Sequence, residues 1–242
     1  MNELTKEEPS SPVKKVKIWN NAKRAENLLV VFWILTGLSI IAIVSSYLQL
    51  ELLKKAQLGE FITEDQANTN DLRQQVIGIL QTILYIVSVI VFLNWFRRAY
   101  GNLLRLGIKG VNHKESMAIW SWIIPIISLF RPVQIMNEIW NKTQEKIKTY
   151  DPSYLIKNGE WLIGLWWTLF ILSNLVGRYI LKTAFRQDSI DGFIISSQAQ
   201  LISDAIQLSE ALLVILIVSQ LSKIELKLMK EVKRAGGIIV NK

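Results

Sequence analysis

The sequence lacks cysteine altogether and has a single histidine, His113. The absence of cysteine excludes disulfides, thiol nucleophiles, iron–sulfur clusters and thiolate zinc sites. One histidine per chain argues against a histidine metal site and against a Ser-His-Asp triad. Glycine-rich phosphate-binding loops are also missing. We therefore expect no catalytic residues, no cofactor and no metal, in a protein that is not an enzyme.

Charged residues are missing from long stretches of the chain. Two uncharged runs, Leu28–Leu50 and Gln74–Phe96, are each 23 residues long. As helices they would extend about 34 Å, more than the roughly 30 Å hydrocarbon core of a bilayer. Two further apolar runs, Trp161–Leu181 and Ile202–Leu221, include a few polar residues. The sequence predicts an all-α integral membrane bundle with four full transmembrane helices in one membrane domain, 28–221.

A fifth apolar run is too short to cross with the others. Ser116–Phe130 has 15 uncharged residues, and Pro125 interrupts it. It would reach only about 22 Å as a helix. We expect a short, Pro-broken, re-entrant or interfacial hairpin over 116–130. The segment that follows, Val133–Tyr150, has apolar residues at helical spacing and predicts an amphipathic helix on the membrane surface or on the bundle.

The linker between the first two spans carries helix-start signals. Thr63 and Gln66 have the spacing of a capping box, which predicts a short helix inside the linker. Thr69–Asp71 supplies residues that favour the N-cap of the second span.

Lysine and arginine indicate the topology. If all five runs crossed, the 28 basic residues would divide equally, whereas four spans place 22 of them on one side. The positive-inside rule therefore favours four spans in a bacterial cytoplasmic membrane, with both termini cytoplasmic. We expect a cytoplasmic N-terminal segment, 1–27, with an interfacial helix over Val13–Asn27, and a basic cytoplasmic tail, 222–242. The positive charge fits anionic lipid head groups, and we expect no nucleic-acid partner.

Three strings resemble a bacterial family of multi-pass membrane proteins: Asn70–Gln75, Trp95–Leu103 and Trp122–Pro132. The resemblance extends from about Ala22 to Leu221. The family is catalogued as a domain of unknown function and is common in Bacteroidetes-type genomes. The resemblance implies membrane location and assigns no activity and no site residues.

Six polar residues form a candidate intramembrane patch, because they fall at similar depths in the predicted spans. An ionisable residue within a span usually faces a partner or water, since its insertion costs about 2.5–3.5 kcal/mol. We expect Arg178 to pair with Glu210 or Asp204, with hydrogen bonds from the amides. The patch could be a structural contact between helices or a site for an ion or small solute. Its members are Gln81, Asn174, Arg178, Asp204, Gln207 and Glu210.

A second set of residues flanks the broken run on the predicted cytoplasmic side. Its arginines could bind lipid phosphates or a cytoplasmic partner, or the set could be ordinary interfacial anchoring. Its members are Trp95, Arg97, Arg98, Tyr100, Asn102, Arg131 and Pro132.

We expect His113 to be a solvated loop residue. We expect the tryptophans to form interfacial belts rather than a ligand box, among them Trp120, Trp122, Trp161, Trp166 and Trp167.

These observations leave two functions open. The first is a non-enzymatic membrane protein that acts through protein or lipid interaction, such as a scaffold, an assembly factor or an envelope regulator. The second is a small oligomeric channel or transporter that uses the polar patch. The expected partners are a bilayer with anionic head groups and, as open alternatives, a second copy of the chain and a cytoplasmic protein.

Overall fold

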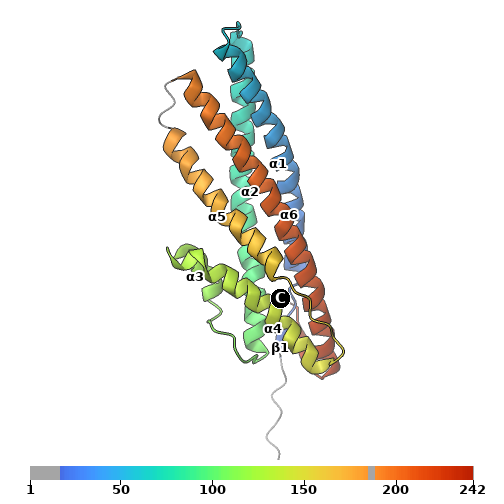
Figure 1. The fold of residues 1–242 in the computed structure, drawn as a ribbon. Coiled ribbons are helices and arrows are strands. Elements are labelled where there is room, and N and C mark those ends of the chain that lie inside the picture. Colours follow the sequence, from blue (N-terminus) through green and yellow to red (C-terminus); the bar gives the residue numbers. More distant parts are fainter. Residues whose placement is uncertain (1–16, 185–188, 242) are drawn as a thin grey trace, which may run out of the picture.

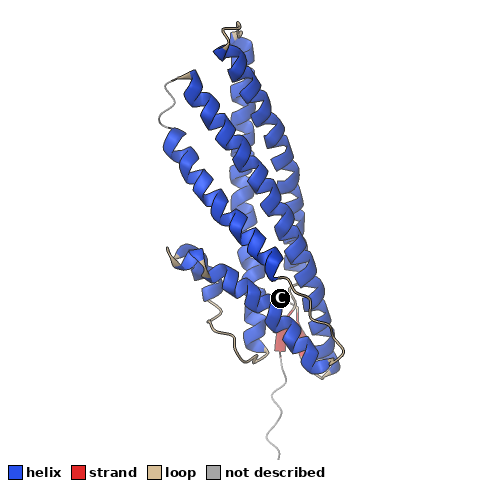
Figure 2. Ribbon diagram, in the orientation of Figure 1, coloured by secondary structure: helices blue, strands red, loops and turns tan. Residues whose placement is uncertain are grey.

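The computed structural model describes residues 17–184 and 189–241. Four long helices form an elongated bundle (Figures 1 and 2): α1 (Ala22–Gln57), α2 (Glu64–Arg105), α5 (Glu160–Ala184) and α6 (Ile190–Arg234). All four are long and apolar enough to cross a membrane. Each contains one of the four predicted spans, so the predicted all-α bundle with four long apolar helices is confirmed.

The four helices are arranged in the order α2, α1, α6, α5. α1 and α6 pack along each other as the central pair, α2 lies against α1, and α5 lies against α6 (Figure 1). α2 and α5 make few contacts with each other. The bundle is therefore not closed on the side between α2 and α5.

The short apolar run is broken, as its proline predicts. It forms α3 (Met117–Ile123) and a 3₁₀ turn, η1 (Ile127–Leu129), with Pro125 and Ile126 between them. Ile126 has a φ of 68°, a left-handed conformation that is strained for a β-branched residue. The chain reverses there and enters α4 (Arg131–Tyr150), which has its proline in the first turn.

α4 buries its apolar face against the bundle. It contacts α2, α5 and α6, and residues at helical spacing along it are buried. The sequence predicts this amphipathic helix either on the membrane surface or on the bundle. The structure shows it packed on the bundle. The buried apolar residues are Ile135, Met136, Ile139, Trp140 and Ile147.

The two ends of the described chain meet beside α4. β1 (Lys17–Trp19) pairs in parallel with β2 (Ile238–Val240). The prediction of one interfacial helix over Val13–Asn27 is therefore wrong for residues 17–19; residues 13–16 lie outside the described part. A strand forms because the Asn102 side chain accepts a hydrogen bond from Trp19 N (3.0 Å) and donates one to Trp19 O (2.8 Å).

Local signals set the start of α2 and the end of α6. The capping box of Thr63 and Gln66 is made, but it begins α2 itself, so the separate linker helix and the N-cap at Thr69–Asp71 are wrong. At the other end of the chain, Gly236 has a φ of +79° and Gly237 N donates to Val232 O, which stops α6 at Arg234.

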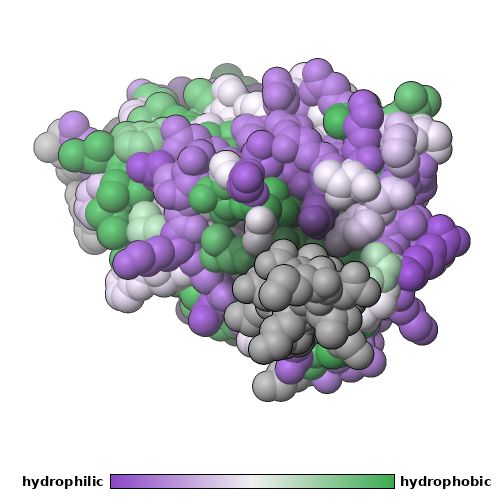
Figure 3. Space-filling model, turned by 90° about the horizontal axis from the view of Figure 1, so that it is seen from below, coloured by the Kyte–Doolittle hydropathy of each residue, from purple (hydrophilic) through white to green (hydrophobic). Residues whose placement is uncertain are grey.

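We call the end of the bundle that carries β1, β2, α3 and α4 the closed end. The opposite half, which contains the α1–α2 connection and the start of α6, is called the open half. Seen from the closed end, the described surface is largely hydrophilic, with hydrophobic patches between the polar residues (Figure 3).

Candidate functional site

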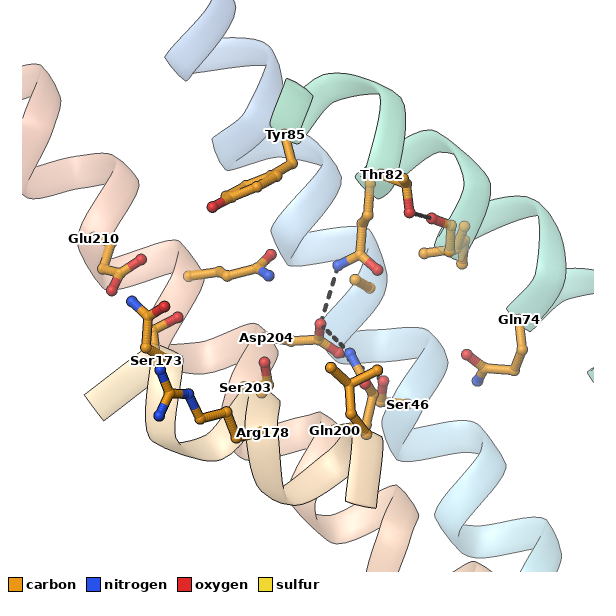
Figure 4. Close-up of a pocket in the computed structure, with 18 of the residues that line it drawn as sticks. Ser46, Gln74, Thr82, Tyr85, Ser173, Arg178, Gln200, Ser203, Asp204 and Glu210 are labelled. Carbon is orange, nitrogen blue, oxygen red and sulfur yellow. Dashed lines mark hydrogen bonds between the residues drawn. The ribbon is translucent and has the colours of Figure 1, made fainter. Parts of the chain in front are cut away.

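A cavity of about 700 Å³ lies in the open half of the bundle. Side chains from α1, α2, α5 and α6 line it (Figure 4), and the cavity faces the side on which α2 and α5 diverge. The structure brings the whole predicted patch to this one place. All six predicted residues are among its lining: Gln81, Asn174, Arg178, Asp204, Gln207 and Glu210.

Asp204 is a buried, extensively hydrogen-bonded residue of the cavity wall. Its side chain is buried, and its carboxylate accepts hydrogen bonds from Ser46 Oγ (2.7 Å), Gln81 Nε2 (3.0 Å) and Gln200 Nε2 (3.0 Å). Hydrogen bonds to a charged group contribute about 1.5–3 kcal/mol each. Asp204 therefore ties α1 and α2 to α6 through uncharged donors, and the expected hydrogen bond from Gln81 is present.

The expected ion pair of Arg178 is not made. Among the described residues, the Arg178 guanidinium lies within ion-pair distance of neither Asp204 nor Glu210. The Asn174 amide donates to Phe170 O (2.7 Å) on its own helix. The physical reason is the position of α5, which packs on α6 and leaves these two side chains exposed at the cavity mouth.

Glu210 occupies a different position in the cavity from Asp204. Its Oε1 atom is buried and receives no hydrogen bond from the described residues. Ser173 lies beside the carboxyl group, and the Tyr85 ring points toward it across the cavity (Figure 4). Among the described residues, no lysine, arginine or histidine lies within ion-pair distance of this carboxyl group.

A second, mostly apolar cavity of about 380 Å³ adjoins the first toward the closed end. Its floor consists of aromatic rings from α2, α3 and α5. Trp122 lies 5.4 Å from Phe92, 6.2 Å from Trp166 and 5.6 Å from Phe170, centroid to centroid. The broken hairpin thus contributes a ring to the cavity floor, because α3 carries Trp122 into the bundle.

The tryptophans therefore divide into two groups. Trp120 and Trp161 are exposed, as expected for an interfacial belt. Trp166 and Trp167 are buried and contact Trp122 at 6.2 and 5.9 Å. The belt prediction is wrong for these three, because the hairpin folds back onto α5 and their rings pack together.

Most of the second predicted set is buried inside the chain. Trp95 and Tyr100 are fully buried, and Arg98, Asn102 and Pro132 are also buried. Burial removes these five side chains from any surface for lipid or a partner, whereas Arg97 is exposed, and the role of the set stays a prediction. The five side chains are buried because α2 continues past its apolar stretch into the packing of β1 and α4.

The arginines of this set have partners within the chain. The guanidinium of Arg98 lies 4.4 Å from the Trp19 ring centroid, and that of Arg105 lies 3.7 Å from it on β1. Arg97 pairs with Glu115 at 3.2 Å. Arg131 Nη1 lies 2.8 Å from His113 Nε2. The set therefore joins α2, β1 and the loop before α3 into one unit.

His113 is not a solvated loop residue. Its side chain is only 15% exposed, and Nε2 lies 3.9 Å from Glu138 Oε1. The Tyr100 hydroxyl donates to Glu138 (2.8 Å) and accepts from His113 N (3.1 Å). This network attaches the loop to α4. Sequence reasoning missed Glu138 because it reads as one of many polar residues on an amphipathic helix.

The chain matches the model of a protein family described as a domain of unknown function, DUF4328, over residues 59–223. It belongs to this family, which confirms the resemblance to an uncharacterised family. The matched range begins after α1 and includes both cavity-lining segments of α5 and α6. Searches of curated proteins and of solved structures gave no match.

Proposed function

We propose that this family member is a non-enzymatic, multi-pass protein of a bacterial cytoplasmic membrane that acts by binding an amphipathic molecule from the bilayer. One observation carries the proposal. Polar side chains from four apolar helices converge on one cavity, and this cavity continues into a second one lined by aromatic rings. Pockets of such size that combine apolar walls with a few polar groups are typical of small-molecule sites.

The charge distribution supports an orientation with the closed end in the cytoplasm. Residues 1–27, 97–160 and 222–242 contain 22 of the 28 lysines and arginines, and 51–73 and 178–203 contain the other six. The described parts of the first group lie at the closed end. By the positive-inside rule this end is cytoplasmic, and the open half is in the outer leaflet.

The packing of the closed end favours binding over conduction. On the closed-end side of the aromatic rings, the centre of the bundle is filled by fully buried side chains, including Trp95, Phe96 and Leu221. A water-filled route through a single chain would have to displace them. A channel or transporter remains the second candidate, supported by the charged residues Arg178 and Asp204 within apolar helices.

Binding within the bilayer is also favoured over a role as a scaffold. The predicted cytoplasmic partner surface is largely buried in the chain's own packing. The polar groups of the open half, in contrast, face a cavity that borders the lipid-facing side of α2 and α5.

Cysteine accessibility tests the proposal, because the chain has no native cysteine. Single cysteines would replace Gln207 in the cavity, Ser153 in the α4–α5 connection and Ser189 at the start of α6. Each variant would be treated with a membrane-impermeant thiol reagent from one side of the membrane. We expect Gln207→Cys and Ser189→Cys to react from outside only, and Ser153→Cys to react from the cytoplasm only.

Other outcomes have definite meanings. Reaction of Ser153→Cys from outside would overturn the orientation. Silence of Gln207→Cys, with Ser189→Cys reactive, would show that the patch is a structural contact between helices. Reaction of Gln207→Cys from both sides would replace the binding role with transport.

A further inference from the structure

Glu210 stands at the junction of the two cavities. It lines both of them, together with Tyr85, Phe170 and Ser173. Arg178 and Asp204 line only the polar cavity. A molecule that fills the apolar cavity therefore meets Glu210 before it reaches any other charged group of the wall.

The two carboxylates of the wall differ in their hydrogen bonding. Asp204 already accepts three hydrogen bonds, from Ser46, Gln81 and Gln200. Glu210 has a buried Oε1 atom that accepts none from the described residues. Burying part of a carboxylate without a cation beside it is costly, so this group is suited to receive the positive charge of a ligand.

The surroundings of Glu210 suit a cation with an apolar body. Tyr85 and Phe170 flank the junction, and Phe92, Trp122 and Trp166 line the apolar cavity. Aromatic faces attract cations within about 6 Å, and Trp does so best. A volume of about 380 Å³ accommodates several rings or short alkyl chains.

The order of charges argues against a phospholipid. In a phospholipid the phosphate is the first charged group after the acyl chains. With the chains in the apolar cavity, this phosphate would lie against Glu210, and its repulsion would oppose binding. Arg178, which would favour a phosphate, lies in the other cavity at the exposed mouth.

We propose that the joined cavities bind a hydrophobic organic cation, with its positive charge at Glu210 and its apolar body on the aromatic floor. The inference rests on the proposed binding function and names the chemical class of the ligand. It assigns Glu210 to recognition, whereas Asp204 holds the wall together.

Binding of tetraphenylphosphonium by the purified full chain in lipid nanodiscs tests the proposal. This probe is bulky and aromatic and keeps its charge at every pH. Neutral triphenylphosphine oxide, which has a similar body, is the matched ligand control. We expect the cation to bind at least about tenfold more tightly than the neutral compound, as expected for a desolvated charge pair with aromatic contacts.

Variants locate the site. Glu210→Gln should lose at least about tenfold in affinity for the cation, while Glu210→Asp, which keeps the charge, should retain most of it. Glu60→Gln, which removes an exposed carboxylate from the α1–α2 connection, should change nothing. If Glu210→Gln does not fold, the affinities of Glu210→Asp and Trp166→Leu for the cation still test the proposal. Trp166→Leu should weaken binding strongly, and Glu210→Asp should not.

The outcomes separate the two proposals. Equal binding of the cation and the neutral compound, unchanged in Glu210→Gln, would overturn the assignment of a cation and leave the binding function intact. Failure of both compounds to bind, together with an unreactive Gln207→Cys, would overturn both. Tight binding of the cation that Glu210→Gln does not change would place the cation elsewhere and overturn the inference.

Discussion

Charged side chains form ion pairs between elements at the closed end, whereas two charged side chains in the cavity of the open half do not. At the closed end, Arg105 pairs with Glu115 at 2.8 Å, and Lys227 pairs with Asp151 at 2.8 Å. In the open half, Arg178 and Glu210 line a cavity and form no ion pair among the described residues. The paired charges at the closed end thus connect parts of the chain, while Arg178 and Glu210 in the cavity are available to a ligand.

The comparison extends to the uncharged polar groups. Asn102 at the closed end bonds the backbone of a strand 83 positions away in sequence. Asn174 in the open half bonds, among the described residues, its own helix alone. We infer that substitutions of side chains that connect parts of the chain change stability, and that substitutions of cavity residues without such partners mainly change binding.

The largest expected effect is the loss of the Asn102 amide. Asn102→Ala would remove both hydrogen bonds to Trp19 and leave backbone groups of β1 without partners, at a cost of about 2–4 kcal/mol. Asn174→Ala is the matched control and should stay within about 0.5 kcal/mol. Thermal unfolding of both variants in the same detergent checks the difference, and equal effects would contradict the comparison.

A steric change at the closed end should come next. A Cβ atom at Gly159 would collide with the Trp140 ring, which is fully buried. Gly159→Ala should therefore destabilise by about 1–3 kcal/mol through overpacking. At Gly164 a Cβ atom would meet nothing within 4 Å, so Gly164→Ala should be neutral or slightly stabilising. Unfolding midpoints in denaturant give both values, and a harmless Gly159→Ala would refute the tight packing of α4.

Within the open half, Asp204 and Arg178 should differ. Asp204→Asn would replace the carboxylate by an amide, which presents either its NH₂ group or a weaker acceptor to the three donors. This should lower the free energy of unfolding by about 1–3 kcal/mol. Arg178→Gln should leave the stability within about 0.5 kcal/mol, since no ion pair is lost. Comparable losses for the two variants would revive the Arg178–Asp204 pair, and a double charge swap would then be expected to restore folding.

The smallest effect concerns pH at the closed end. The hydrogen bond from Lys227 lowers the pKa of the Asp151 carboxyl in the folded state. The carboxylate therefore contributes stability above the usual aspartate pKa of about 3.9, and this contribution is lost as the pH falls through the lowered value. Asp151→Asn should slightly lower the melting temperature at pH 6 and leave it unchanged at pH 2. A loss of the same size at both pH values would contradict the assignment.

The sequence predicts the spans well, because they depend on length and composition alone. Leu28–Leu50 and Gln74–Phe96 are uncharged over a membrane thickness, and each lies within one long helix. The break at Pro125 is a local effect of backbone chemistry. Local rules fail at β1, because its partners, Asn102 and β2, are far away in sequence.

The members of the polar site could be predicted, but their pairing could not. A polar residue within an apolar span stands out, which identified Gln81, Asp204 and Glu210. Opposite charges suggested an Arg178 pair, yet pairing depends on how far α5 leans from α2, and the sequence does not encode this locally. Ser46 was missed because serine is common in spans; Gln200, four residues before Asp204 on the same helix, was open to prediction.

The most direct test of the account is the labelling of Gln207→Cys from outside, with and without tetraphenylphosphonium. The residue lines both cavities, so its reaction reports their access to water, and protection by the cation reports occupancy. We predict that an impermeant thiol reagent labels it and that the cation slows the labelling in the otherwise native chain, with no protection when Glu210→Gln is also present. A cysteine that never reacts, while Ser189→Cys does, would contradict the open cavity on which the account depends.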